Sequence, residues 1–194
     1  FIELQSGMSL NDFFNERIFK PLGMIDTQFY LKSDKQERLV SVQTKKDGKW
    51  VDFYDDRFNV NYPFQGSKSI FFGGCGLTST VKDYAKFVQM VLNKGRFNGN
   101  QIIGKKTAET MLTGQGYLSW GSEVSLGFSL MKDDLYSTGI GGSKGTFSTG
   151  GYWNTSAFAD PVENIIGIIY KQTYDIGNDP TSAAYRRLVF QSII

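Results

Sequence analysis

The apolar run Ile165-Ile166-Gly167-Ile168-Ile169-Tyr170 is the sequence feature that most restricts the fold. Its hydrophobic side chains fall on both faces of an extended segment, so a strand here must be covered on both sides. The turn sequence Asp160-Pro161-Val162-Glu163 joins this run to an upstream strand region. We therefore predict consecutive strands over about 146–159 and 164–172, with the second buried at the centre of a sheet.

A helix is predicted to follow these strands. Asp179 suits the N-cap position and Pro180 suits the first turn. Its apolar positions recur every four residues, in the series Ala184 and Leu188 and the series Tyr185, Val189 and Ile193. The helix should lie on the sheet, so the residues predict a chain that mixes α and β structure.

Local signals place the remaining elements. We predict helices over about 10–19, 81–93 and 105–113, and short strands over 27–31, 49–54 and 126–131. Ser9 should cap the first helix, which is expected to end before Pro21, and Asn98-Gly99 predicts a two-residue hairpin turn. Much of residues 25–70 has no regular period, which is typical of a binding loop or of a segment packed over a core.

The chain contains no histidine, which excludes Ser-His-Asp and Cys-His catalysis and most zinc sites. Cys75 is the single cysteine, so it forms no internal disulfide, and we expect it to be a small buried residue in the Gly73–Gly76 turn. No metal or organic cofactor is implied. The net charge of +2, from 21 basic and 19 acidic residues, gives no electrostatic reason to expect a nucleic-acid partner.

The apolar runs and the first residues of the chain indicate whether it crosses a membrane and whether it is part of a longer protein. No apolar run approaches the length of a membrane-spanning helix. Phe1-Ile2-Glu3-Leu4 opens without Met, helix cap or basic signal region, and it has the pattern of a helix that lacks its beginning. We therefore expect the chain to be part of a longer protein.

Ser79-Thr80-Val81-Lys82 has the Ser-x-x-Lys spacing of the nucleophile motif in penicillin-binding proteins and serine β-lactamases. Thr80 and Asp83, however, have capping-box spacing, so Ser79 should precede a helix. That helix has a polar face with Lys82, Lys86, Gln89 and Asn93, and an apolar face with Val81, Tyr84, Ala85, Val88 and Leu92. A solvated Lys82 would stay protonated, because a lysine base needs burial or nearby positive charge. We interpret the motif as a structural helix start.

Two further matches are also interpreted as structural. Tyr152-Trp153-Asn154 fits the Tyr-x-Asn motif of the same enzymes but lies in the closing strand region. The loop Gly139–Gly145 is glycine-rich like a phosphate-binding loop, yet it lacks the Gly-Lys-Ser/Thr ending. Neither match predicts a catalytic group.

Three segments taken in order resemble the C-terminal half of the serine β-lactamase-like family. They are SGMSLNDFFNERIFKPLGMIDTQF (residues 6–29), GGCGLTSTVKDYAKFVQMVLNKGRFNGNQII (73–103) and FSTGGYWNTSAFADPVENIIGIIYKQ (147–172). Within this family, the segments resemble class C β-lactamases, family VIII esterases and penicillin-binding-protein-like D-alanyl peptide hydrolases. The resemblance implies that residues 1–194 are the C-terminal portion of one domain with a β-lactamase/transpeptidase-like fold. The fold class would be α+β, with an antiparallel sheet flanked by helices. About 1–115 would be mostly helix and loop, and about 116–194 would be strands plus the C-terminal helix.

The resemblance also implies a site. The family's nucleophilic Ser, its Lys and the Tyr of Tyr-x-Asn would all lie upstream of this chain. The family's Lys-Thr-Gly-type triplet, on an edge strand, aligns with Thr149, Gly150 and Gly151, which would bind substrate. The backbone N–H of Tyr152 would be a catalytic oxyanion-hole donor. From the residues alone, the two glycines fit equally well a strand that a ligand approaches or a bulge.

Thr149 replaces the usual cation of the triplet, which pairs with a substrate carboxylate. This favours neutral esters or amides over classical β-lactams, and residues 61–64 are a candidate wall of the site. The expected reaction is hydrolysis of a small ester, β-lactam or D-alanyl peptide through an acyl-enzyme. The chain alone should be inactive. The alternatives are a non-catalytic module that binds cell-wall peptide or sugar, or a piece with no independent function.

The expected partners follow from this reading. They are a small ester or amide, or a cell-wall peptide, with no nucleic acid and no membrane span. An uncovered strand edge would favour a homo-oligomer. The family resemblance implies a periplasmic or secreted location.

Overall fold

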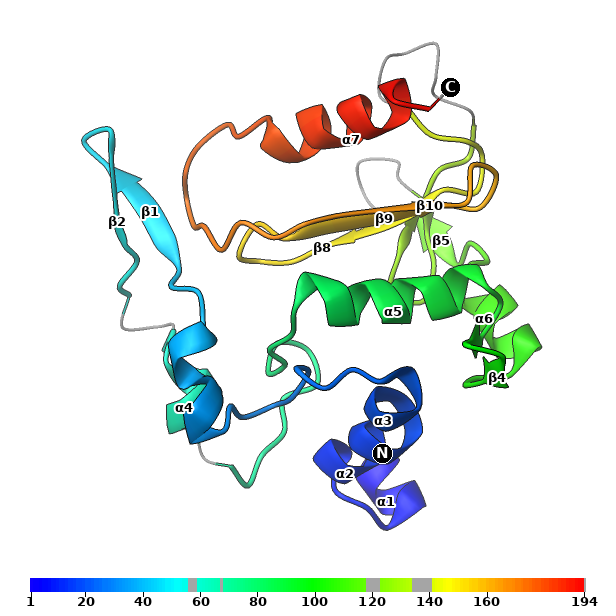
Figure 1. The fold of residues 1–194 in the computed structure, drawn as a ribbon, viewed down its shortest axis with the longest axis horizontal. Helices are drawn as coiled ribbons and strands as arrows, with labels where there is room; N and C mark the ends of the chain where they lie inside the picture. The colour runs from blue at the N-terminus through cyan, green and yellow to red at the C-terminus, as the bar shows by residue number, and fades with distance from the viewer. Residues whose placement is uncertain (56–58, 67, 118–122, 134–140, 194) are drawn as a thin grey trace. The chain divides into compact units, whose positions relative to one another are not determined.

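The computed structural model describes residues 1–55, 59–66, 68–117, 123–133 and 141–193. They form two compact units (Figure 1). The first unit contains Phe1–Phe87 with Gln172–Tyr174, and the second contains Val88–Lys171 with Asp175–Ile194. The division falls inside helix α5 (Val81–Leu92).

The first unit opens with short helical segments. They are α1 (Ile2–Ser6), α2 (Leu10–Phe14), the π-helix η1 (Asn15–Phe19) and α3 (Lys20–Leu22). The hydroxyl of Ser9 accepts the N–H of Asp12 at 3.1 Å, which confirms the predicted cap. The predicted stop before Pro21 is wrong. Pro21 lies in the first turn of α3, where a missing N–H is tolerated, and the helix ends at Gly23 in the left-handed conformation (φ 66°).

The rest of the first unit is mostly loop. Its regular elements are the 3₁₀ helix η2 (Ser33–Arg38), β1 (Gln43–Lys46), β2 (Lys49–Asp52) and α4 (Tyr62–Gln65). The strand predicted over 49–54 is present as β2, and its partner β1 was not predicted. The strand predicted over 27–31 is reduced to a single bridge between Gln28 and Thr78. Cys75 is exposed, which corrects the expected burial, because the glycine-rich turn that carries it is itself largely exposed.

Aromatic rings form the core of the first unit. Phe29 is 1% exposed, and its ring contacts those of Phe14 and Phe71, with centroids 5.8 and 5.2 Å apart. Leu22 and Met24 are buried as well. The residues that follow the N-terminal helices are therefore anchored by hydrophobic burial.

The second unit contains a six-stranded antiparallel sheet. The strands are β5 (Gly116–Tyr117), β6 (Glu123–Val124), β7 (Ser129–Leu130), β8 (Phe147–Gly150), β9 (Ser156–Asp160) and β10 (Ile165–Ile169). Their order is β10-β9-β8-β7-β6-β5, with every pair antiparallel. The predicted α+β class with an antiparallel sheet is confirmed.

Two predicted strand positions are wrong. Within the described residues β10 lies at one side of the sheet rather than at its centre, because its apolar pattern reports how its faces are covered and not which strands lie beside it. The strand region 146–159 is two strands, β8 and β9, joined by a turn. Tyr152 and Asn154 therefore lie in that turn and not within a strand.

Helices complete the second unit. After α5 come the hairpin β3 (Arg96–Phe97) and β4 (Asn100–Gln101), then α6 (Lys105–Met111) and, at the end, α7 (Thr181–Gln191). The hairpin has positive φ at Asn98 (47°) and Gly99 (81°), as the predicted turn requires. In α5 the predicted apolar face is wrong at Val81, which is 42% exposed, whereas Val88 and Val91 are buried.

Helix α7 lies along β10 (Figure 1). The ring of Phe190, which is 6% exposed, stacks on Phe158 of β9 at 5.4 Å. Gly167 of β10 faces the same Phe158, and a Cβ there would come within 2.3 Å of its ring, so a side chain at this position would collide with the core. Leu188 is 65% exposed, which corrects its placement on the sheet-facing side.

The described helices include none that combines the length and the apolar character needed to cross a bilayer. The longest of them are α5 and α7, with 12 and 11 residues. A transmembrane helix needs about 20 residues.

Candidate functional site

Strand β7 pairs with only the first half of β8. Ser129 lies opposite Ser148 and Leu130 opposite Phe147, and the ladder stops there. The chain before β7 turns back on itself, because the N–H of Ser125 bonds to the carbonyl of Phe128 at 2.8 Å. Thr149 and Gly150 consequently extend beyond β7 while they remain paired with β9. This corrects the expectation of an edge strand: β8 lies inside the sheet, and among the described strands β7 does not pair with the part of β8 that carries Thr149 and Gly150.

A hollow of about 300 Å³ lies at this place, and we call it the β7–β8 hollow. It is lined by Val124, Ser125, Gly127, Phe128, Ser129, Ser148, Thr149 and Gly150. Four of these residues carry hydroxyl groups, and none of the eight carries a charged side chain. Its volume is at the lower end of the range for small-molecule pockets.

The predicted site residues divide between the hollow and the following turn. Thr149 and Gly150 line the hollow, whereas Gly151 and Tyr152 begin the turn to β9, which we call the 150–155 turn. Tyr152 is 61% exposed, and its ring meets that of Trp153 edge-on at 5.0 Å. The substrate-binding role of the three triplet residues and the oxyanion role of the Tyr152 N–H remain predictions.

Backbone hydrogen bonds close the 150–155 turn. The N–H of Gly151 donates to the carbonyl of Thr155, and the N–H of Asn154 donates to the carbonyl of Gly151, both at 3.0 Å. Asn154 has a positive φ of 65°, the left-handed conformation that Asn tolerates better than most residues. A Cβ on Gly151 would lie 2.4 Å from the Thr155 hydroxyl, so this position is restricted to glycine unless Thr155 moves.

Asp179, for which only a capping role was predicted, also bonds to this turn. One carboxylate oxygen accepts the side-chain amide of Asn154 at 3.2 Å and the ammonium of Lys171 at 2.5 Å. The other accepts the N–H and the hydroxyl of Thr181, at 3.0 and 2.5 Å. The hydrogen bond from Lys171, followed by those from Thr181, holds the pKa of Asp179 well below its usual range. The N-cap residue itself is Pro180, so Asp179 satisfies the helix start from one position further upstream than predicted.

Asp160, at the end of β9, is fully buried and accepts four hydrogen bonds. The donors are the N–H groups of Ser143, Val162 and Glu163 and the hydroxyl of Thr146, at 2.7–3.1 Å. Burial alone would raise the pKa of Asp160, but these donors together lower it. The described part of the glycine-rich loop thus uses its Ser143 amide to bind a carboxylate of its own chain. Residues 139 and 140 of that predicted loop lie outside the described residues.

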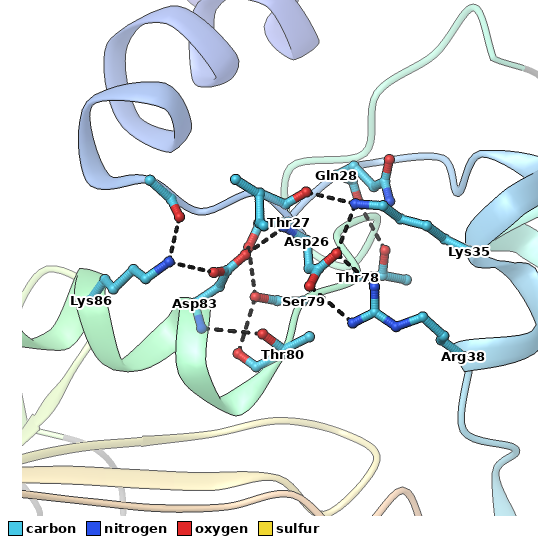
Figure 2. A network of polar contacts seen from close by, with 12 residues as sticks. Asp26, Thr27, Gln28, Lys35, Arg38, Thr78, Ser79, Thr80, Asp83 and Lys86 are labelled. Atoms are coloured by element: carbon cyan, nitrogen blue, oxygen red, sulfur yellow. Dashed lines mark hydrogen bonds and ion pairs between the residues drawn. The ribbon is translucent and has the colours of Figure 1, made fainter.

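The Ser79 motif, in the first unit, has the geometry of a structural element (Figure 2). The Thr80 hydroxyl accepts the N–H of Asp83 at 3.2 Å, which confirms the predicted cap. The Ser79 hydroxyl lies 2.7 Å from that of Thr27. Lys82 is exposed, as predicted, so it has none of the burial that a lysine base needs.

Asp83 departs from the predicted capping box. Its carboxylate, 2% exposed for the residue, accepts the N–H of Asp26 at 2.7 Å, the hydroxyl of Thr27 at 3.2 Å and the ammonium of Lys86 at 2.9 Å (Figure 2). Lys86 also donates to the carbonyl of Gly23. The residue thus joins α5 to the loop after α3 rather than closing its own helix turn.

Asp26 extends this network to η2. It pairs with Lys35 at 2.7 Å and with Arg38 through two hydrogen bonds at 2.8 and 2.9 Å (Figure 2). The hydrogen bonds from Arg38 and Lys35 hold the pKa of Asp26 well below its usual range. The polar groups around Ser79 therefore connect α5, the loop after α3 and η2 to one another.

A second Ser-x-x-Lys spacing, Ser129 to Lys132, was missed in the sequence. Ser129 lies in β7 and Lys132 lies beyond its end at Leu130, so the two are not one helical turn apart as the family's motif requires. Lys132 bonds instead to the hydroxyl of Tyr117. This pair is not arranged as nucleophile and base, although Ser129 itself lines the hollow.

Residues 61–64, the predicted wall, belong largely to α4 in the first unit. The hydroxyl of Tyr62 lies 2.9 Å from that of Tyr30, and this hydrogen bond raises the pKa of Tyr62. The role of residues 61–64 as a wall of the site remains a prediction. Across the ranges that the structure describes, no three Cys, Asp or Glu side chains approach one another as metal ligands would.

Comparison with known proteins identifies the family. A family model described as Beta-lactamase matches residues 1–191, and the chain therefore belongs to this family. The protein Rv1367c of Mycobacterium tuberculosis, strain H37Rv, is 29% identical over 169 residues. That match covers 78% of this chain and 40% of Rv1367c.

Two solved structures share the fold. EstCE1, described as a hydrolase with promiscuous acyltransferase activity, matches with a TM-score of 0.81 and 19% identity, over 97% of this chain and 52% of its own. The simvastatin synthase LovD of Aspergillus terreus matches with a TM-score of 0.78 and 21% identity, over 97% of this chain and 51% of its own. The chain thus spans about half or less of the length of these proteins.

Proposed function

We propose that this chain supplies the substrate-facing strand and an oxyanion-hole donor of a serine hydrolase that acts on neutral esters or amides. The nucleophilic serine and its base would lie outside residues 1–194. The serine oxygen would attack the carbonyl carbon and expel an alcohol or amine. Water would then attack the acyl-enzyme, release the acid and restore the serine.

The observation that carries this proposal is the β7–β8 hollow, whose described lining residues carry no charge. Thr149 stands where related enzymes carry a cation, and the hollow that it lines has no charged side chain among its eight residues. A substrate carboxylate would be desolvated there without a partner, which is costly. A neutral acyl group can instead contact Val124 and Phe128 and accept hydrogen bonds from the hydroxyl groups.

The neighbouring turn supplies the second part of the argument. The Tyr152 N–H lies two residues after the end of the hollow-lining strand β8, in a turn closed by backbone hydrogen bonds. A rigid amide donor beside a substrate pocket is what stabilisation of a developing oxyanion needs, and the loss of one such donor costs about 3 kcal/mol in the barrier.

The test uses the intact protein that contains this chain. It is incubated with p-nitrophenyl butyrate, with a chromogenic cephalosporin and with a serine-reactive fluorophosphonate. We expect ester hydrolysis faster than cephalosporin hydrolysis, and phosphonate attachment to a serine outside residues 1–194. Attachment to Ser79, or turnover by residues 1–194 alone that Ser79→Ala abolishes, would contradict the proposal.

A second candidate is a non-catalytic module for cell-wall sugar or peptide. The four hydroxyl-bearing residues of the hollow favour it, because such groups can bind sugar hydroxyls. This candidate predicts no turnover of either chromogenic substrate and no phosphonate attachment. It also predicts binding of muropeptide fragments that Thr149→Trp, which fills the hollow, would weaken.

A further inference from the structure

The 150–155 turn is stabilised by contacts beyond those of an ordinary hairpin. A strand connection of this kind needs only its backbone bonds and one residue in the left-handed conformation. Here the left-handed residue is Asn154, and its side chain also reaches Asp179, 25 residues further along the chain. The turn is thus tied to the segment that begins α7.

Both carboxylate oxygens of Asp179 accept hydrogen bonds from several groups. Its two oxygens receive four hydrogen bonds, from Asn154, from Lys171 just after β10, and from the N–H and hydroxyl of Thr181. The side chains of Asp179 and Lys171 are only 15% and 13% exposed. A carboxylate with this many partners and so little exposure has little freedom to move. Asn154 therefore bonds to a fixed point.

The hydrogen bond between Asn154 and Asp179 lies close to the peptide unit that carries the Tyr152 N–H, which suggests a role in catalysis as well as in stability. Asn154 lies two residues after Tyr152, and its own N–H bonds to the carbonyl of Gly151, the residue whose peptide bond carries the Tyr152 N–H. The orientation of that peptide unit consequently depends on where Asn154 is held. A hydrogen-bond donor for an oxyanion acts only when it is aimed before the reaction begins.

We propose that Asp179, held by Lys171, is a positioning residue that acts through Asn154 to orient the Gly151–Tyr152 peptide for catalysis. This inference rests on the proposed function. Asp179 and Lys171 do not touch substrate in this scheme. They fix the turn that does.

The first arm of the test measures catalysis in the intact protein with p-nitrophenyl butyrate. Asn154→Gly accommodates the left-handed conformation without strain and removes the side-chain amide that bonds to Asp179. Asp179→Asn removes the charge that holds Lys171 and Asn154. We expect each variant to lower kcat about tenfold with KM changed less than twofold, because a misaimed donor weakens transition-state binding alone.

A double variant and a control separate positioning from general destabilisation. Since Asn154 and Asp179 act in one chain of contacts, the double variant should lose no more kcat than the worse single variant. Asp26→Asn breaks a comparable ion pair in the first unit and should leave kcat unchanged. Full additivity of the two losses, or unchanged kcat in Asn154→Gly, would overturn the positioning role.

The second arm does not depend on activity. Hydrogen exchange of the Gly151 amide, which bonds to Thr155, reports directly on closure of the turn. We expect exchange about tenfold faster in Asn154→Gly and in Asp179→Asn than in Asp26→Asn. If the wild-type protein shows no hydrolysis but this exchange rises, the proposed function fails while the anchoring of the turn stands. Unchanged exchange in both variants would reject the anchoring itself.

Discussion

The surroundings of Ser79 and of Thr149 differ in how their polar groups are used. Ser79 belongs to a motif that matches a catalytic pattern, yet its hydroxyl contacts Thr27 and the neighbouring Asp83 carboxylate is occupied by three donors. Thr149 was predicted, from family resemblance, to stand at the cation position of the Lys-Thr-Gly-type triplet, and it borders an open hollow. A motif therefore predicts chemistry poorly unless its polar atoms remain available to a ligand.

Each of the two units contains a buried carboxylate that is supported in a similar way. Asp83 and Asp160 are both almost inaccessible to solvent, and each gathers donors from segments distant in sequence. Asp83 also forms an ion pair with Lys86, whereas the described hydrogen-bond donors to Asp160 are all neutral groups. The buried charge of Asp160 is thus hydrogen-bonded by oriented dipoles, and the charge of Arg186 also interacts with it electrostatically.

Replacement of Asp160 should have the largest effect. Asp160→Ala leaves three N–H groups and one hydroxyl without their acceptor in a buried place. We expect the free energy of unfolding to fall by about 3 kcal/mol or more, as measured by urea denaturation. The exposed Asp34→Ala is the matched control and should change stability by less than about 0.5 kcal/mol. Equal effects of the two variants would show that the neutral-donor support is unimportant.

The second prediction restores a cation to the hollow. Under the proposed function, Thr149→Lys should raise kcat/KM for an anionic β-lactam about tenfold relative to the neutral ester, because an ammonium can pair with the substrate carboxylate. Thr149→Met, of similar length and no charge, is the control. If Lys and Met at this position give the same substrate ratio, the hollow does not face the substrate.

The third prediction concerns acid stability in the Ser79 region. Since Lys35 and Arg38 lower the folded-state pKa of Asp26, the pair stabilises the protein above the unfolded pKa of about 4, and this contribution declines as the pH falls further. Asp26→Asn should therefore cost about 1 kcal/mol at pH 7, a value discounted for partial exposure, and less at pH 3. Thermal unfolding at both pH values measures this. A cost that grows on acidification would contradict the assigned sign.

How far the sequence predicts this molecule depends on the range of the interaction concerned. The cap at Ser9, the hairpin at Asn98 and the helix start at Thr80 are encoded within a few residues, and each is present. The position of β10 in the strand order is not encoded locally. Its four isoleucines indicate that both faces of the strand are covered, but they do not indicate which strands lie beside it.

The candidate site shows the same limit. Family resemblance selected Thr149 and Gly150, and the structure adds the hollow that they border. The link from Asn154 to Asp179 was not predicted, because it joins residues 25 apart that local patterns assign to a strand and to a helix cap. Burial of Cys75 was expected from residue type alone, and the exposed turn that carries it overrides this preference.

The smallest expected effect comes from the Ser79 motif itself. Ser79→Ala removes one hydroxyl contact to Thr27, which keeps Asp83 as a partner, so the free energy of unfolding should fall by about 1 kcal/mol or less. Lys82→Ala alters an exposed side chain and should change it by less than about 0.5 kcal/mol. Neither variant should change kcat of the intact protein on p-nitrophenyl butyrate by more than about twofold, since neither removes a group placed to react. A hundredfold loss of kcat in both variants would contradict this interpretation of the Ser79 motif. It would mean that the Ser79 hydroxyl, which contacts Thr27 in the structure, becomes available during catalysis.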